Sequence, residues 1–200
     1  MAEVKLTKNE LKRQKDALKR FQRYLPTLQL KKQQLQMVIR QVEAEERSQA
    51  QMRDRILGQI KSWSGLLDGP VKPEDFLKVL EVRTSRSNIA GVDIPVFESV
   101  SFHEDVYDLF DTPPWLDRMI EELRHLVEVE GRVRVLAEQR RLLSEELRIT
   151  TQRVNLFEKV KIPETRDNIR RIRIYLGDQQ TAAVVRGKIA KSKVLAGATP

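Results

Sequence analysis

Residues 11–67 read LKRQKDALKRFQRYLPTLQLKKQQLQMVIRQVEAEERSQAQMRDRILGQIKSWSGLL, and their apolar side chains recur at alternating steps of three and four. With Leu11 and Gln14 at heptad positions a and d, 12 of the 17 seam positions are apolar, whereas the whole chain is 40% apolar. The apolar seam positions are Leu11, Leu18, Phe21, Leu25, Leu28, Leu35, Ile39, Val42, Ile56, Ile60, Trp63 and Leu67. This pattern predicts a coiled-coil helix of about 85 Å, roughly twice the width of a compact domain formed by a chain of this length.

A second seam begins after Pro113 and Pro114, which are tolerated in the first turn of a helix. Its positions are Leu116, Met119, Leu123, Leu126, Val133, Ala137, Leu147 and Val154. Beyond Pro163 the heptad phase slips, and the seam continues with Ile169, Ile172, Leu176 and Ala183. The second half of the chain therefore supplies a partner for the first helix.

The two seams fit together as an antiparallel pair. In the register that aligns them, Glu46 lies opposite Arg140, and Arg53 lies within a turn of Glu130. Complementary polar residues at one level of a seam fix the register, at some cost in stability.

The segment between the helices contains turn signals and β-branched residues. Glycine and proline end the first helix near Gly65 to Pro73, and Glu74 to Leu80 is expected to form a short helix. Residues 79–102 predict a β-hairpin with a turn at Thr84–Asn88, and Pro95 indicates an edge strand.

The chain is thus divided into a first helix (1–67), a connection (68–113), a second helix (114–193) and a tail (194–200). Thr7 followed by Glu10 predicts a capping box at the start of the first helix. Pro26 and Pro163 are expected to kink the helices. The predicted fold class is all-α dominated, a long antiparallel two-helix coiled coil with a small hairpin and short-helix insertion at the turn end.

Composition agrees with an elongated helical protein, since 33% of the residues are charged and 6% are aromatic. The absence of cysteine excludes disulfides and thiol chemistry and fits a reducing cytoplasm. No run of 18 apolar residues occurs, so neither a membrane span nor a secretory signal is expected.

Charge is distributed unevenly along the chain. Residues 1–40 carry a net charge of +8, residues 41–158 carry −7, and residues 159–200 carry +7. If the chain folds back on itself, the two basic ends meet and form a positive tip. That tip has two interpretations, a solvated helical surface or a functional electrostatic contact.

The sequence does not assemble an active site. His103 and His125 stand alone, without the spacing of metal ligands, and Gly65 to Gly69 lacks the lysine of a phosphate-binding loop. Acidic pairs such as Glu121-Glu122 fit a solvated helix face. Trp63 and Trp115 fit packing anchors. No cofactor is expected, and nucleic-acid binding is disfavoured because the basic segments share their helix faces with seam leucines.

Three segments resemble one known family. Residues 6–19 read LTKNELKRQKDALK, which is similar to the opening of the D subunits of the vacuolar/archaeal-type (V/A-type) rotary ATPases. Residues 153–163 (RVNLFEKVKIP) resemble the R-V-N-A-L-E-x-V-x-I-P block of that family, with Leu156-Phe157 in place of Ala-Leu. Residues 88–95 (NIAGVDIP) resemble its central N-I-x-G-V-x-V-P segment.

The resemblance implies a non-catalytic central-stalk rotor subunit that transmits torque between the catalytic A/B hexamer and the membrane ion-translocating ring. It implies contacts with the F subunit, with the catalytic A and B subunits and with a C/d-type subunit, on the cytoplasmic face of the membrane. Lys12, Lys19, Lys188 and Lys191 would then face the bore of the hexamer. The alternative is a coiled-coil scaffold or a nucleic-acid-binding structural protein.

Overall fold

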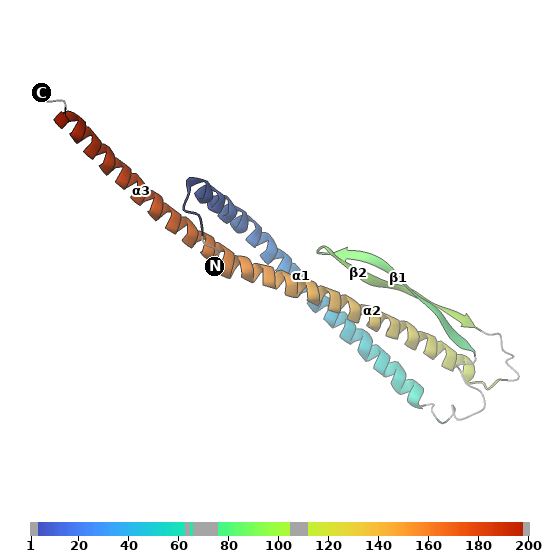
Figure 1. Cartoon of the computed structure of the whole chain (residues 1–200). Helices are drawn as coiled ribbons and strands as arrows, with labels where there is room; N and C mark the ends of the chain where they lie inside the picture. The colour runs from blue at the N-terminus through green and yellow to red at the C-terminus, as the bar shows by residue number, and fades with distance from the viewer. Residues whose placement is uncertain (1–3, 63–64, 66–75, 105–111, 198–200) are drawn as a thin grey trace. The chain divides into compact units, whose positions relative to one another are not determined.

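The computed structural model describes residues 4–62, 65, 76–104 and 112–197. In chain order, one β-hairpin lies between two long helical stretches (Figure 1). The elements in chain order are α1 (Lys8–Ser62), β1 (Leu77–Ile89), β2 (Val92–Glu104), α2 (Leu116–Asn155), the π-helix η3 (Leu156–Lys161) and α3 (Ile162–Gly197). The chain is mostly helical, and the predicted fold class is confirmed.

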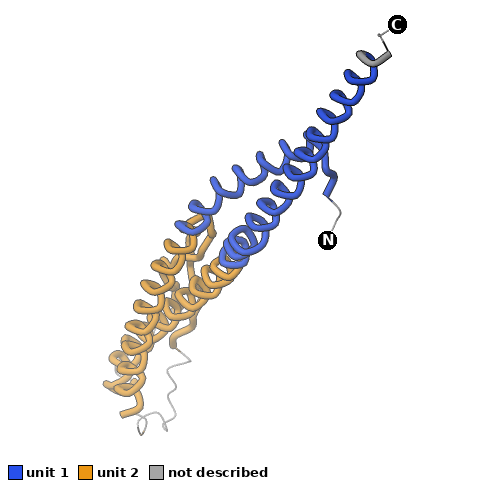
Figure 2. Tube along the Cα trace, turned by 90° about the vertical axis from the view of Figure 1, so that its left-hand side faces the viewer, with its two compact units in different colours: residues 1–30, 150–200 blue, residues 31–149 orange. Residues whose placement is uncertain are grey.

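The chain divides into two compact units, coloured separately in Figure 2. Unit 1 comprises residues 1–30 and 150–200, and unit 2 comprises residues 31–149. Unit 1 therefore holds the start of α1 together with the end of α2, η3 and α3. Unit 2 holds the rest of α1 and α2 with the hairpin.

Helix α1 begins where the sequence places a cap. The backbone N–H of Glu10 donates to Thr7 Oγ1 at 3.3 Å, and the N–H of Leu11 donates to the Thr7 carbonyl at 2.9 Å. These bonds satisfy donors that have no intrahelical partner in a first turn. Pro26 lies inside α1 with an exposed side chain, and a bend at this residue stays a prediction.

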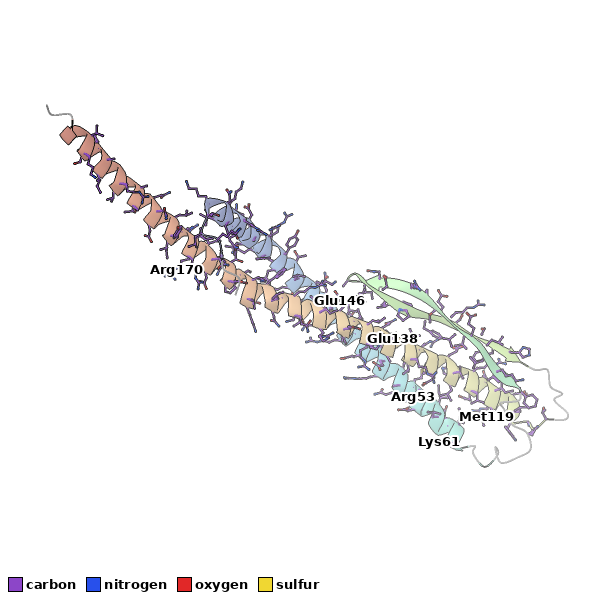
Figure 3. All side chains as sticks on the ribbon, viewed as in Figure 1. Arg53, Lys61, Met119, Glu138, Glu146 and Arg170 are labelled. Atoms are coloured by element: carbon purple, nitrogen blue, oxygen red, sulfur yellow. The ribbon has the colours of Figure 1, made fainter. Side chains whose placement is uncertain are left out.

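Unit 2 has the predicted antiparallel register between α1 and α2. Arg140 Nε donates to Glu46 Oε2 at 2.8 Å, and Arg53 Nη1 lies 3.6 Å from Glu130 Oε2. Both pairs were expected from the alignment of the two seams, and both are confirmed. Figure 3 shows Arg53 on α1 and Glu138 and Glu146 on α2.

The hairpin adds a third layer to unit 2, alongside α2 (Figure 1). The core joins side chains from both helices and from the hairpin: Leu35, Ile39, Val42, Ile94, Leu136 and Leu143. Gln139 Nε2 donates to the Pro95 carbonyl at 2.6 Å, which ties α2 to β2. A Cβ built on the buried Gly131 would lie 3.0 Å from Phe97 Cε2, so the ring packs directly on the helix backbone.

The turn of the hairpin differs from the prediction. Residues 84–88 lie inside β1, paired with residues 93–97 of β2, and the chain reverses at Ala90 and Gly91. Both turn residues have positive φ, 53° and 77°, as a two-residue type I′ turn requires. Asn88 stabilises this turn, because its Oδ1 accepts from the Gly91 N–H at 3.0 Å and its Nδ2 donates to Asp93 Oδ1 at 2.6 Å.

Two other expected boundaries also differ. Residues 77–80 of the expected short helix belong to β1, where residues 77–79 pair with residues 102–104 of β2 and Leu80 lies at a register shift; residues 74 and 75 lie outside the described residues. Helix α3 continues to Gly197, so residues 194–197 of the expected tail are helical.

In unit 1 the phase slip of the second seam coincides with η3. Side chains at Thr150 and Val154 before η3, and at Ile162, Thr165 and Ile169 after it, are buried. The step from Val154 to Ile162 is eight residues, one more than the seven of two helical turns. A π turn takes up one extra residue, so it returns the seam of α3 to the side that faces α1.

Proline explains why the wide turn lies here. Pro163 has no N–H to donate to the carbonyl four residues earlier, and its ring would clash with that carbonyl in a regular α-helix. Instead the Ile162 N–H donates to the Phe157 carbonyl, five residues back, and Thr165 Oγ1 donates to the Lys161 carbonyl at 2.6 Å. The expected bend at Pro163 stays a prediction.

Candidate functional site

The residues expected at the seam are buried or half-buried wherever the structure describes them, with the exception of Ala183, which is exposed. The buried ones are Leu35, Ile39, Val42, Ile56, Leu116, Met119, Val154, Ile169 and Ile172. The half-buried ones are Leu11, Leu18, Phe21, Leu25, Leu28, Ile60, Leu123, Leu126, Val133, Leu147 and Leu176. Trp63 and Leu67 lie outside the described residues. The seam therefore supplies much of the buried apolar surface of the two units.

Helix α2 carries a second apolar row that the heptad assignment missed. Val129, Leu136 and Leu143 are buried at seven-residue spacing, three residues after seam positions. This row packs in unit 2 because α2 is covered by the hairpin as well as by α1. The signal was present in the sequence, since a helix with apolar residues on two adjacent stripes needs two neighbours.

Ion pairs join charged residues of α1 to charged residues of α2 in unit 2. Besides the two register pairs, Lys31 Nζ donates to Glu146 Oε1 at 2.7 Å between α1 and α2. The pKa of Arg53 is raised, first by its hydrogen bond to Asp54 and then by the charges of Asp54 and Glu130. These contacts neutralise cations within the unit and fix the pairing of the helices.

Two rings meet across the helices of unit 1. The ring centroids of Phe21 on α1 and Phe157 in η3 lie 5.3 Å apart, inclined by 42°. Aromatic pairs at this separation stabilise by about 0.5–1.5 kcal/mol beyond the area they bury. Phe157 is one of the two residues that depart from the family block, and the π turn brings it onto the α1 side.

The four lysines expected at one basic tip lie in two different places. Lys12 and Lys19 line a groove between α1 and α3, where their neighbours across the groove are Arg166, Arg170 and Arg173. All four lysines are exposed.

Lys188 and Lys191 follow more than ten residues after this groove along α3. The expectation that the two basic ends meet is therefore wrong for these two lysines, because the register pairs Lys12 and Lys19 with an earlier part of α3.

The last part of α3 is uncovered. Every residue from Gly177 to Val194 is exposed, and Figure 1 shows no other described segment of unit 1 beside this stretch. Its apolar residues include Val184, Val185, Ile189 and Val194, exposed by 59, 48, 51 and 71%. At about 100° per residue, Val185 and Ile189 share one face of the helix, and Val184 and Val194 project to two other sides.

The two histidines lie on different elements. His103 is exposed on β2, and His125 is half-buried on α2. Among the residues that the structure describes, no group of three or more histidine, aspartate or glutamate side chains is arranged to hold a metal ion. None of the described helices has the length and apolar character required to cross a lipid bilayer.

These features define a class of proteins, the antiparallel two-helix coiled coils with an inserted hairpin and a long exposed helical surface. The model of the ATP synthase D subunit family matches residues 10–192. The chain belongs to this family.

Related chains extend over nearly the full length. The V-type ATP synthase D subunit of Borreliella burgdorferi is 49% identical over 195 residues, which cover 98% of this chain and 96% of the relative. The corresponding D subunits of Chlamydia caviae and Chlamydia felis are 36% and 35% identical over 196 residues, covering 96% of this chain and 94% of each relative.

Proposed function

We propose that this chain is the central-stalk rotor subunit of a V/A-type rotary ATPase, non-catalytic itself, which transmits torque between the catalytic A/B hexamer and the membrane ion-translocating ring. The observation that carries the proposal is the exposure of α3 from Gly177 to Val194. A single helix with apolar side chains in several directions is stabilised when other chains surround it. The bore of a hexamer of catalytic subunits provides such surroundings.

Other exposed apolar residues support further partners in the same complex. Leu30, Met37 and Met52 on α1 are exposed by 59, 58 and 40%, which suits the packing of the F subunit on the helix pair. Val79 and Leu80 near the start of β1 are exposed by 48 and 65%, which suits the seating of a C/d-type subunit. The protein would then lie peripherally on the cytoplasmic face of the membrane, as part of the complex.

Truncation after Leu176 tests the proposal. The shortened chain should keep the fold of unit 2, because the removed residues belong to unit 1 and residues 177–194 are exposed. In a complex reconstituted with its A, B and F subunits and the membrane sector, ATP hydrolysis should continue while ATP-driven ion transport falls severely. Amide hydrogen exchange of residues 31–149 controls for folding, and full ion transport by the truncated complex would refute the proposal.

Charge reversal tests the electrostatic part. Changing Lys12, Lys19, Lys188 and Lys191 to glutamate should uncouple hydrolysis from rotation, because these exposed cations would meet the wall of the bore. Changing the same four residues to arginine keeps the charge and should keep the coupling. If hydrolysis and rotation are coupled equally in both variants, the electrostatic part of the proposal is refuted, and only the packing of α3 inside the hexamer remains proposed.

A further inference from the structure

The groove between α1 and α3 collects positive charge from both helices of unit 1. It has a volume of about 900 Å³ and is lined on the α1 side by Lys8, Lys12, Lys15 and Lys19. The α3 side contributes Arg166, Arg170 and Arg173. Asp16 is the one acidic residue in this lining. Figure 3 shows Arg170 on α3 where that helix passes the N-terminal part of α1.

These seven cations differ from the paired cations of unit 2. Among the residues that the structure describes, none of the seven forms an ion pair, whereas Lys31, Arg53 and Arg140 of unit 2 each pair with a carboxylate of the opposite helix. Like charges that converge on one groove repel each other and create a positive potential. An incoming acidic group relieves that repulsion, so the groove favours an acidic ligand.

The floor of the groove is apolar. Leu11 and Leu18 from α1 and Ile169 and Ile174 from α3 lie among the lining residues. Ile174 is 56% exposed, and the two leucines are only half-buried although they belong to the seam. An inorganic anion would leave this floor in contact with water. A ligand with an apolar face between two acidic edges would cover it and would also meet both rows of cations.

The length of the groove fits a helix. The lining residues of α1 extend from Lys8 to Gln22, which spans about 21 Å, or about four helical turns. On the α3 side the lining extends from Arg166 to Ile174, about 12 Å, so both rows of cations would meet a bound helix over about two of its turns. A groove between two helices accepts a third helix by the same side-chain packing that joins the pair.

We infer that this groove binds an amphipathic, acidic helix of about four turns, supplied by a partner chain. Its apolar face would lie on Leu11, Leu18 and Ile174, and its glutamate or aspartate side chains would pair with the lysines of α1 and the arginines of α3. The inference deepens the proposed function and rests on it for the identity of the chain that supplies the helix. The acidic and amphipathic character of the helix is inferred from the groove of unit 1 alone.

A designed peptide tests the groove on the full-length chain. The probe is a fluorescent peptide of about 16 residues with leucine on one helical face and glutamate on both flanks. Its fluorescence anisotropy should show saturable 1:1 binding at about 0.15 M ionic strength. The double variant Lys12→Glu and Arg170→Glu should weaken binding by about tenfold or more, because it reverses one charge on each side of the groove.

The chain offers a matched control on the same helix. The double variant Lys188→Glu and Lys191→Glu changes the net charge equally but lies outside the groove, and it should leave the affinity within about twofold. Ile174→Gln tests the floor, and it should weaken the peptide without disturbing the fold because this side chain is already exposed. Circular dichroism checks that each variant remains helical.

Several results would overturn the inference. These are the absence of binding, equal loss in the groove variant and its matched control, no effect of Ile174→Gln, or equal affinity for a scrambled peptide or for inorganic polyphosphate. The last two would show attraction by net charge alone. The peptide assay contains no ATPase, so its failure concerns the groove only, whereas loss of the rotor function would appear in the ion-transport assay alone.

Discussion

In unit 2 the cations of one helix meet carboxylates of the other, whereas in unit 1 the cations of the two helices meet each other. Unit 2 has 18 basic and 22 acidic residues, a net charge of −4, and unit 1 has 19 basic and 7 acidic residues, a net charge of +12. Unit 2 also has a third layer, since the hairpin covers α2. The comparison indicates that unit 2 neutralises its cations within the unit, while unit 1 keeps a positive charge that its own carboxylates do not balance.

Single-residue deletions give the largest expected contrast. Removing Glu158 from η3 should restore a seven-residue step between Val154 and the next buried isoleucine, so the core stays in phase and only the fit of Pro163 in a regular α-helical turn should cost stability, up to about 3 kcal/mol. Removing Arg134 from α2 should rotate one part of the helix by about 100° against the other and cost more than about 3 kcal/mol, because the core of unit 2 is displaced. Urea unfolding followed by circular dichroism measures both.

The two deletions control each other, since each removes one exposed charged residue from a long helix. Hydrogen exchange should show residues 116–149 less protected after the second deletion and unchanged after the first. Equal destabilisation by both would contradict the view that η3 holds one surplus residue.

Replacing a leucine by alanine should destabilise unit 2 more than unit 1, but the difference should be smaller than that between the two deletions. Leu143 is fully buried among α1, α2 and the hairpin, so Leu143→Ala should destabilise unit 2 by about 2–5 kcal/mol. Leu25 is half-buried in unit 1, and Leu25→Ala should cost less than half of that amount. The free energy of local opening, measured by hydrogen exchange in each unit, is the quantity to compare; a larger loss in unit 1 would reverse the comparison.

The smallest effect concerns an exposed ion pair of unit 2. Arg141 donates two hydrogen bonds to Glu138, at 2.8 and 2.7 Å, and these lower the pKa of the Glu138 carboxyl from its ordinary value of 4.5. Because the folded-state pKa is lowered, this contribution to stability is present above the unfolded pKa and is lost as pH falls through the folded value. Arg141→Gln should raise the pKa of Glu138 in a carboxyl-carbon NMR titration.

Arg134→Gln removes a different ion pair of the same helix, with Glu130, and serves as the control. It should leave the titration of Glu138 unchanged. If Arg141→Gln also leaves that titration unchanged, the hydrogen bonds seen in the structure do not persist in solution.

The helix pair and its register in unit 2 were predictable because they depend on spacing alone. A heptad seam fixes which face is buried, and the polar seam residues Glu46 and Arg140 leave few registers that place opposite charges together. The existence of a hairpin was equally evident from its β-branched residues, and the proline pair before α2 marked the start of the second helix.

What the sequence did not reveal depends on contacts between distant segments. The turn at Ala90 and Gly91 depends on the Asn88 side chain, which accepts a hydrogen bond from the Gly91 N–H. In the sequence, the polar stretch just before it is the stronger turn signal. The apolar row that includes Leu136 was visible in the sequence, but the neighbour that covers it was not, because the hairpin's position on α2 follows from tertiary packing. The basic groove was missed because charge was summed over the ends of the chain, whereas the register decides that Lys12 meets Arg170 and not Lys188.

The close contact at Gly131 has a mechanical meaning. A hydrogen atom takes the place of a side chain beneath the Phe97 ring, and Arg132 lies with its guanidinium carbon 5.3 Å from the centre of that ring. If the hairpin slid along α2, the ring would have to pass over a bulkier residue on either side, so this notch resists axial displacement. A force applied to the strands would therefore be delivered to α2 at one level, and the hairpin would move with the helix as a single lever.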